Sequence, residues 1–553
     1  MSSPGGSGAG AEPGPSEDRD LAEAVAEYFR LELELARCDV HDSFFAMGGT
    51  SLAALRILAA LRERYGVRLG LADVFDHPTP ALLAGRLAAH GGTRDGDLRE
   101  PHGQGRATRD SSERFPLAHN QEGFFEISKA AGDAPFFNIV GSLRFSGQVD
   151  PGAITAAVAE VARRQGALRM CFGEDGGRPV QWTTDAAPAV REVDLRPDGP
   201  ARLRRLLTRE QRTGFRLAEG PPVRFILART GDRDWSLVWT AHHLIFDGVS
   251  NGILAEELAH AYQVRLGGQS PRAELTARYT DFALWQRDTL TGDRLADHLR
   301  ALEETLSRPS MPIAPVPERG YMTRLSTFRI DRNATGGLRQ VAARLDVSMF
   351  VLLVAAALGF VAGRGGGHGG GHVPRIGVQA ANRSWPGSEA LIGCFSNSLL
   401  VDGPAKPGDD PRHLADAAKA ALTRALRHEE MPLELAMRLL TRRGADLTGR
   451  LPEFGLALQP GPRTRIHLSG GILEPVPVII EGDYVDPTEF PLVVELFTRD
   501  GGFSGVSHHM VAAWPGDTHA QAMAELGAAI GRLAGTDTEG DSPACQARSH
   551  TIR

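Results

Sequence analysis

Two adjacent histidines, followed four residues later by an aspartate and then a glycine, form the first candidate catalytic group of this sequence. The residues are His242, His243, Asp247 and Gly248, and they follow an apolar run typical of a strand. A histidine facing a cavity could accept and return protons, because its pKa lies near neutrality. Successive residues of an extended segment point to opposite faces, so only one histidine can face such a cavity. The pair alone leaves a purely structural role open.

A serine, Ser51, is the second candidate, because it follows a glycine pair and opens an apolar-periodic helical segment. Gly48 and Gly49 precede it, and leucines follow at positions 52, 55, 58 and 61. Serine is a favoured cap at a helix start, where the helix dipole is positive. Slender glycines would let a bulky phosphate donor approach. These residues alone allow a simple cap or an attachment point for a phosphate ester.

The elements that position these residues are predicted from periodicity. Leu21, Val25 and Phe29 have helical spacing, and we expect Phe44 and Phe45 to anchor the loop before Ser51 in a helical core. Later in the chain, β-type runs alternate with alanine-rich helical runs, which predicts an α/β architecture. The runs with strand character are 139–145, 223–227, 236–240 and 375–379, and those with helical character are 153–164 and 348–361.

Composition excludes several classes of protein. The chain has 553 residues, 42% of them hydrophobic and 23% charged, with a net charge of −7, so no global basic field indicates nucleic acid. The sequence contains no apolar run of about 18 residues, so no membrane-spanning helix is expected. No signal peptide is recognisable, and the four cysteines lie far apart, so we expect free thiols and a cytoplasmic protein. No cysteine, glutamate or third histidine stands at ligand spacing near His243, so no metal site is expected there.

The segment around Ser51 resembles the peptidyl-carrier domains of nonribosomal peptide synthetases. It reads Asp42-Ser-Phe-Phe-Ala-Met-Gly-Gly-Thr-Ser-Leu, and the run Val74-Phe-Asp-His-Pro-Thr-Pro-Ala-Leu-Leu resembles the later helices of that family. The resemblance implies a small all-α four-helix carrier domain over residues 18–90, after a flexible tail at 1–17. It also implies that Ser51 carries 4′-phosphopantetheine, whose thiol holds an acyl or aminoacyl group as a thioester. Residues 91–113 are glycine-rich and polar, which is typical of a linker.

The segment around His243 resembles the condensation domains of the same synthetases, whose signature is His-His-x-x-x-Asp-Gly. That family is similar in fold to chloramphenicol acetyltransferase, which implies two α/β lobes, at residues 114–287 and 288–538, before a polar tail at 539–553. Further motifs support the resemblance: Pro116-Leu-Ala-His-Asn-Gln121, Tyr279-Thr-Asp-Phe-Ala-Leu-Trp-Gln-Arg287, Ile376-Gly-Val-Gln-Ala-Ala-Asn-Arg383, Leu391-Ile-Gly-Cys-Phe-Ser-Asn397 and His428-Glu-Glu-Met-Pro432.

Three segments depart from the family pattern. Residues 164–169 read Arg-Gln-Gly-Ala-Leu-Arg, so the usual histidine and glutamate between the two arginines are missing. A glycine-rich stretch with His368 and His372 replaces a charged segment, and we interpret it as a loop rather than a metal site. Residues 490–492 read Phe-Pro-Leu instead of Phe-Asp-Leu, which puts the usual contacts between the lobes in doubt.

The resemblance implies roles for the site residues. His243 would assist the attack of an amine on the donor thioester, either as a general base or by orienting the amine. Asp247 would pair with Arg383 behind the site, His242 would support the backbone, and Gly248 would leave room for the prosthetic arm. Ser250 and Asn397 would be either polar wall residues or structural supports of the site.

The expected function is amide-bond formation between the acyl or aminoacyl group on Ser51 and an acceptor amine delivered in trans. The expected partners are a phosphopantetheinyl transferase, an adenylation domain acting in trans, and either an acceptor carrier protein, which we favour, or a free amine. Two alternatives remain. Epimerases share the histidine motif but usually have Ser-Trp where this chain has Ser250-Asn251. A catalytically silent recruitment domain is disfavoured by the intact motif.

Overall fold

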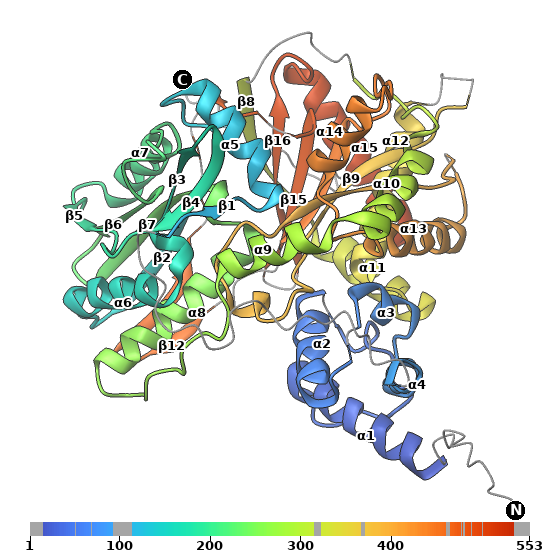
Figure 1. Ribbon diagram of the computed structural model, residues 1–553, viewed down its shortest axis with the longest axis horizontal. Coiled ribbons are helices and arrows are strands. Elements are labelled where there is room, and N and C mark those ends of the chain that lie inside the picture. The colour runs from blue at the N-terminus through green and yellow to red at the C-terminus, as the bar shows by residue number, and fades with distance from the viewer. Residues whose placement is uncertain are drawn as a thin grey trace, which may run out of the picture. The chain divides into compact units, whose positions relative to one another are not determined.

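The computed structural model describes residues 15–49, 51–67, 69–91, 113–314, 322–365, 371–406, 408–459, 465–476, 478, 480, 482–487, 489–499 and 502–535. The chain divides into two compact units, a small helical unit at the N-terminus and a larger α/β unit (Figure 1). Residues 1–14 of the expected N-terminal tail, the tail at 539–553, most of the linker at 91–113, and His368 lie outside the described residues, whereas residues 15–17, expected in the tail, begin the first helix.

The N-terminal unit is helical throughout its described part. Its helices are α1 (Pro15–Glu32), α2 (Ser51–Tyr65), α3 (Leu71–Asp76) and α4 (Pro80–Gly91). Phe44 and Phe45 are buried, as predicted, and their rings pack edge to face 5.3 Å apart. A Cβ at Gly49 would lie 2.4 Å from the ring of Phe44, so only glycine lets the loop pass this close to the core. The aromatic pair thereby fixes the loop that leads into Ser51.

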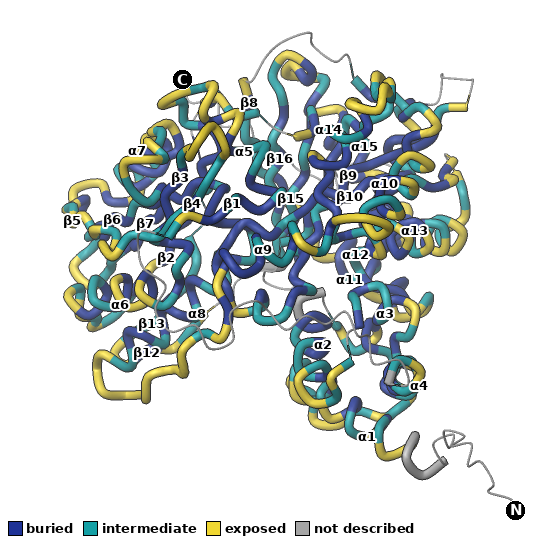
Figure 2. Tube along the Cα trace, viewed as in Figure 1, coloured by how far each residue is buried: buried dark blue, intermediate teal, exposed yellow. Residues whose placement is uncertain are grey.

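The first lobe of the α/β unit is built on a six-stranded sheet in the order β12-β13-β2-β7-β6-β5. Helices α6 and α8 pack on one face through the first-lobe core, and α7 packs on the other. Side chains of β6 and β7 alternate between these two cores, as expected for a strand covered on both faces. The central strands are accordingly buried (Figure 2). The bounds are β2 (Asn138–Gly147), β5 (Val190–Asp194), β6 (Val223–Arg229), β7 (Asp234–His242), β12 (Ile466–Leu468), β13 (Gly471–Pro475), α6 (Pro151–Arg164), α7 (Gly199–Gln211) and α8 (Gly248–Arg265).

A small three-stranded sheet and α5 complete this lobe. The sheet has the order β1-β4-β3. Helices α9 and α10 then carry the chain toward the second lobe (Figure 1). The bounds are β1 (Phe115–Pro116), β3 (Met170–Asp175), β4 (Arg178–Thr183), α5 (His119–Ala131), α9 (Tyr279–Thr289) and α10 (Gly292–Leu306).

The second lobe is built on a seven-stranded sheet in the order β10-β9-β11-β15-β16-β8-β14. It mixes parallel and antiparallel pairs: β11 is parallel to both β9 and β15, whereas β15 and β16 are antiparallel. The bounds are β8 (Met322–Ile330), β9 (Arg375–Ala380), β10 (Asn397–Asp402), β11 (Phe454–Gln459), β14 (Tyr484–Val485), β15 (Leu492–Arg499), β16 (Gly502–Met510), α11 (Arg332–Leu345), α12 (Met349–Arg364), α13 (Pro411–Leu426), α14 (Leu433–Arg442) and α15 (Gly516–Ala534).

Segments from the later half of the chain form part of the first lobe, which corrects the expected division at residue 288. The hairpin β12–β13 comes from the later half of the chain, yet β13 pairs antiparallel with β2 of the first sheet. The loop between β9 and β10 likewise places Leu391, Cys394 and Phe395 in the first-lobe core. Sequence spacing could not reveal this arrangement, because it depends on long-range strand pairing.

Among the residues that the structure covers, no single helix is long and apolar enough to cross a membrane. Helices α11 and α12 pass that test only when taken together, and they are bent by 108° at the break between them. No group of three or more His, Cys, Asp or Glu side chains within the described ranges could hold a metal ion.

Candidate functional site

The two motif histidines lie where strand β7 ends inside the first lobe. The strand ends at His242, and a short 3-10 turn, His243–Ile245, redirects the chain toward α8. The backbone N–H of His243 donates to Phe137 O at 2.9 Å, which fixes the start of the turn. His242 is buried, whereas His243 is partly accessible. Only His243 can therefore meet a substrate, as the alternation of an extended segment predicted.

His242 is held by the protein through both ring nitrogens. Its Nδ1 accepts a hydrogen bond from Leu244 N at 3.1 Å, so the ring proton resides on Nε2, which lies 3.1 Å from Ser128 Oγ. Burial lowers the pKa of His242 to about 3, and the neighbouring His243 contributes to the decrease. The ring is neutral near pH 7 and supports the turn, in agreement with its expected role.

His243 is framed by an aromatic ring and a thiol. Phe124 of α5 stacks on the imidazole, with ring centroids 4.6 Å apart and an interplanar angle of 17°. The Sγ of Cys394 lies 3.8 Å from Nδ1. Burial lowers the pKa of His243, and the charge of Asp247 opposes that decrease. The imidazole is thus neutral near pH 7, which is the form that can accept a proton.

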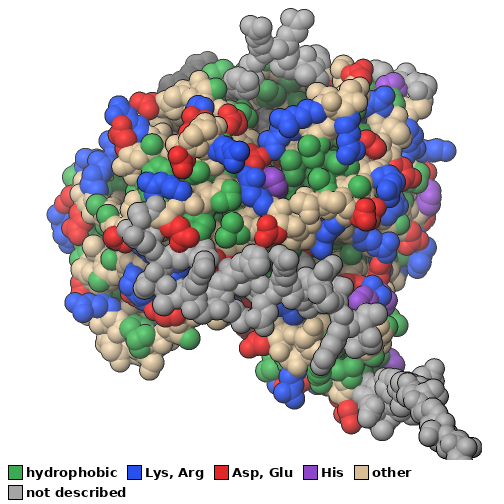
Figure 3. Space-filling model, viewed as in Figure 1, with side chains coloured by type: hydrophobic (Ala, Val, Ile, Leu, Met, Phe, Trp, Pro, Cys, Tyr) green, Lys and Arg blue, Asp and Glu red, His purple; other side chains and the backbone are tan. Residues whose placement is uncertain are grey.

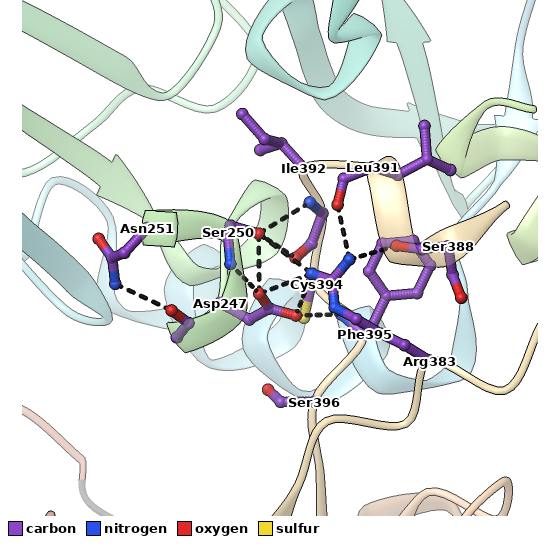
Figure 4. A network of polar contacts seen from close by, with 12 residues as sticks. Asp247, Ser250, Asn251, Arg383, Ser388, Leu391, Ile392, Cys394, Phe395 and Ser396 are labelled. Carbon is purple, nitrogen blue, oxygen red and sulfur yellow. Dashed lines mark hydrogen bonds and ion pairs between the residues drawn. The ribbon is translucent and has the colours of Figure 1, made fainter. Parts of the chain in front are cut away.

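Asp247 caps α8 and forms a buried ion pair with Arg383, as the family resemblance implied (Figure 4). Its Oδ1 accepts from Ser250 N at 2.9 Å and from Ser250 Oγ at 2.7 Å. Arg383 Nη2 donates to Oδ1 at 2.9 Å and to Oδ2 at 3.0 Å. Phe395 N donates to Oδ2 at 3.1 Å. These contacts occupy both carboxylate oxygens, so Asp247 holds the site together rather than reacting.

Arg383 extends this network into the loop between β9 and β10. Its Nη1 donates to Leu391 O at 2.6 Å and to Ser388 O, and its guanidinium lies 4.5 Å from the centroid of the Phe395 ring. The same loop carries Cys394 to His243. The buried ion pair therefore connects the helix that follows the catalytic turn with the loop that lies against the imidazole.

The space beside Gly248 is occupied by the end of a flexible side chain, and the expected passage for the prosthetic arm at this glycine stays a prediction. A Cβ there would lie 2.0 Å from Oε1 of Gln459, the last residue of β11. The glycine lets a second-lobe strand approach the start of α8. Movement of the Gln459 amide would be needed to clear the space.

Asn397 and Ser250 are structural supports. Asn397 Nδ2 donates to Glu429 O at 2.9 Å and to Met431 O at 2.7 Å, and its Oδ1 accepts from Leu433 N at 3.1 Å. Ser250 Oγ bonds both Asp247 and the backbone of Gly393. Both residues are buried. Of their two expected roles, the structure places them in the supporting one.

Other motif residues brace the catalytic turn. Gln121 Nε2 donates to Leu244 O at 2.7 Å, directly after His243. Asn120 Nδ2 donates to Phe395 O at 3.0 Å and its Oδ1 accepts from Gln286 Nε2 at 3.0 Å. The opening motif and α9 thus hold the turn and the Cys394 loop together.

The three departures from the family pattern are accommodated differently. Gln165, at the position of the missing histidine, donates to Ala390 O at 2.9 Å and accepts from Ile392 N at 2.9 Å. Arg164 pairs with Glu257 at 2.9 Å. The lobes remain in contact near residues 490–492, because Asp486 Oδ1 accepts from Phe137 N at 3.1 Å. His372 lies within the described residues but joins no candidate metal cluster there.

Four residues near the site were missed by the sequence reasoning: Phe124, Cys394, Glu434 and Glu489. Each stands inside or beside a quoted motif; Glu434, for instance, lies two residues after Pro432. Their spacing carries no signal, because two α-helices, α5 and α14, and two loops carry them.

Ser51 opens α2 directly after the anchored loop. Gly48 has a φ of +90°, a conformation that favours glycine, and a Cβ there would meet nothing within 4 Å. The loop therefore has an open side at Gly48, which fits the attachment of a phosphopantetheine arm nearby.

Comparison with known proteins agrees with this geometry. Residues 19–87 match the family model of the phosphopantetheine attachment site, and residues 111–452 match that of the condensation domain. The chain is 29% identical over 465 residues to a dimodular nonribosomal peptide synthase from Bacillus subtilis, covering 81% of this chain and 19% of that protein. It is 31% identical over 466 residues to the probable non-canonical nonribosomal peptide synthetase CymA of Salinispora arenicola, covering 81% and 6%.

The fold is shared with a solved structure, the first condensation domain of the calcium-dependent antibiotic synthetase in complex with a substrate analogue. The TM-score is 0.66 at 18% identity, covering 79% of this chain and 98% of that one. The chain spans only about a fifth or less of the curated relatives named above. The predicted carrier and condensation folds are thus confirmed, and the chain belongs to the condensation-domain family of nonribosomal peptide synthesis, whose members form amide bonds, here preceded by a phosphopantetheine attachment domain.

Proposed function

We propose that the α/β unit joins an acyl or aminoacyl donor, held as a thioester on Ser51, to an acceptor amine delivered in trans. The observation that carries this proposal is a neutral, partly accessible His243 held between Phe124 and Cys394. The phosphopantetheine arm on Ser51 supplies the thiol that makes the donor an activated thioester.

His243 moves the proton in this reaction. The Cys394 thiol lies beside Nδ1 and has a pKa raised well above its ordinary value by burial, so it stays uncharged. Nε2 is the nitrogen left for the substrate. It accepts a proton from the amine nitrogen as the C–N bond forms, and gives it up to sulfur as the C–S bond breaks. General-base assistance of this kind supplies on the order of 10²–10⁴-fold in rate.

The surrounding network supplies position rather than protons. Asp247 and Arg383 fix the turn and the Cys394 loop, and His242 fixes the backbone between them. Correct alignment of amine and thioester contributes to the rate independently of proton transfer.

The partners follow from this chemistry. A phosphopantetheinyl transferase modifies Ser51, an adenylation domain in trans supplies the donor, and a separate carrier protein presents the acceptor. Charges of both signs are interspersed over the face shown in Figure 3, which supports such partners rather than nucleic acid. We also place the protein in the cytoplasm, where these partners act.

The test uses the full chain converted to its holo form, loaded with a panel of acyl groups and offered aminoacyl carrier proteins or free amines. Mass spectrometry of the intact protein and its products should show a new amide. The variant Ser51→Ala should gain no mass from coenzyme A and the transferase. Inversion of a stereocentre without an amide would favour epimerisation. If neither an amide nor an inverted stereocentre forms, the result would favour a recruitment domain. Amide formation with free amine alone would show that the acceptor is a soluble amine and not a carrier-bound one.

A further inference from the structure

One carboxylate that contacts the helix bearing Phe124 has no part in the mechanism above. Glu434 is the second residue of α14, and its carboxylate fills the space over Gly123 of α5, where a Cβ would lie 1.5 Å from Oε2. The next residue, Phe124, is the ring that stacks on His243. Glu434 therefore lies against the helix whose Phe124 ring frames the catalytic imidazole, and its charge also acts on the Cys394 thiol, which lies 3.8 Å from His243 Nδ1.

Glu434 has no hydrogen-bond or ion-pair partner among the residues that the structure describes. The basic residue one turn along α14, Arg438, binds Glu122 of α5 instead. Glu122 also binds Arg287 of α9. Arg438 and Arg287 are thus already paired with another carboxylate. Glu434 itself is exposed to solvent.

The surroundings of Glu434 disfavour its charge. Burial raises its pKa, Arg438 opposes the increase, and the charge of Glu122 adds to it. Glu489, in the segment before β15, is affected in turn: burial raises its pKa to about 7, hydrogen bonding with Ser398 and Gln379 opposes the increase, and Glu434 adds to it. Both residues are nevertheless exposed, so a cation in solvent can reach their side chains.

We propose that Glu434 is a further catalytic residue, which binds the acceptor in its ammonium form and removes the first of the two protons that the ammonium must lose before the amide forms. The proposal rests on the condensation function proposed above. An amine in neutral water is mainly an ammonium ion, and an ammonium cannot attack a carbonyl. A carboxylate without an ion-pair partner among the described residues suits this first deprotonation.

The protons and bonds balance. The ammonium gives one proton to the Glu434 carboxylate, which later passes it to water. The amine then attacks the thioester, and its second proton goes to His243 Nε2 as the C–N bond forms. That proton leaves for sulfur as the C–S bond breaks. One proton is released for each amide formed from an ammonium acceptor.

The test measures binding, so it needs no knowledge of the natural substrates. Two pantetheine derivatives serve as acceptor-arm probes, one bearing an S-2-aminoethyl group and the other the uncharged S-propyl group of similar size. Their dissociation constants are measured by titration calorimetry on the full-length protein, and on Glu434→Gln, His243→Ala and Glu126→Gln. The last is a matched control, since Glu126 is an exposed carboxylate on α5.

The wild type should bind the ammonium probe about tenfold more tightly than the propyl probe, a ratio that corresponds to about 1.4 kcal/mol. Glu434→Gln should lose that preference, while His243→Ala and Glu126→Gln keep it. The preference should weaken at low pH, because protonation of Glu434 removes the charge that attracts the ammonium. Equal or absent binding of the ammonium probe by the wild type, or an unchanged preference in Glu434→Gln, would overturn the proposal.

Failure of this proposal is distinguishable from failure of the function on which it rests. If the wild type forms amides but lacks the ammonium preference, only the role of Glu434 is wrong. If it shows the preference but forms no amide with any donor and acceptor, the condensation function is wrong.

Discussion

At the residue scale, His243 and Asp247 share a motif but have different surroundings. The imidazole is partly accessible and stacks on Phe124. The carboxylate is buried and bonded on both oxygens, chiefly to Arg383 and Ser250. Substitution of the two residues should therefore have different effects on activity and stability.

His243→Ala should lower the rate of amide formation by on the order of 10²–10⁴-fold, because the proton carrier is lost. Loading of Ser51 should continue at the wild-type rate. Product formation and loading are both followed by mass spectrometry. His260→Ala is the control, since that histidine is half-buried on α8 and bonds only a loop carbonyl at 3.1 Å among its described contacts. A His243→Ala rate within a factor of two of wild type would contradict the assignment.

Asp247→Ala should lower the free energy of unfolding by roughly 3–5 kcal/mol, because Arg383 would remain buried without its carboxylate. The measurement is urea denaturation. Asp234→Ala is the matched control: Asp234 pairs with Arg144 at 2.7 Å on the surface, where such a pair contributes about 0–1 kcal/mol. An Asp247→Ala protein that is inactive but as stable as wild type would instead indicate a direct chemical role.

At the element scale, helix α14 depends on a single side chain of strand β10. Asn397 satisfies two carbonyls before α14 and the N–H of Leu433, its first residue. Asn397→Ala should cost about 1–3 kcal/mol of stability, since buried polar groups lose their partners. Asn251→Ala, which removes one 3.2 Å bond to Gly248 O, should cost less. Denaturation midpoints that fall equally in both variants would contradict this role.

The contact between β16 and α15 should make stability dependent on pH. His509 and His519 stack with ring centroids 3.7 Å apart, and burial lowers their pKa values to about 3 and about 4. Both rings are neutral in the folded state, whereas in the unfolded chain they take up protons below about pH 6.5. Stability is therefore complete above that pH and is lost as the pH falls toward 4.

Urea denaturation at pH 7.5 and pH 5.0 checks this dependence. His519→Gln removes one titrating group and keeps an amide that could bond Ser507 Oγ, which lies 2.9 Å from the histidine. The loss of stability between the two pH values should be smaller in that variant. A loss equal to that of wild type would show that other groups cause it.

Local elements were predictable from the sequence because their periodicity is strong. The helix expected at 153–164 is observed at 151–164, and the strand expected at 223–227 is observed at 223–229. The Asp247–Arg383 pair was available only from the family resemblance. Phe124 and Cys394 beside His243, and Glu434 against Gly123, were not predictable, since these contacts depend on how α5, the β9–β10 loop and α14 pack.

At the scale of the whole molecule, the later half of the chain contributes strands and a loop to the first lobe. The α/β unit should therefore unfold in a single cooperative transition. β13 completes the first sheet, and the Phe137–Asp486 hydrogen bond joins the lobes next to it. Calorimetry of the full chain should show one large transition for this unit, with a calorimetric to van't Hoff enthalpy ratio of about 1.

A variant in the second sheet tests this cooperativity. Leu496→Ala in β15 removes a fully buried side chain and should shift the large transition to lower temperature without splitting it. Leu61→Ala in α2 should shift only the smaller transition of the helical unit. Two separate transitions within the α/β unit would contradict the prediction.

The pairing of β13 with β2 also limits where the chain can be cut. A fragment ending at residue 287 would keep β2 but lose β13, which pairs with residues 143–147 of that strand. The strand would then present unpaired amide and carbonyl groups along an open edge, and such edges recruit other chains into intermolecular sheets. Fragments for recombining synthetase modules should therefore retain the hairpin, or they will aggregate even though every first-lobe residue before it is present.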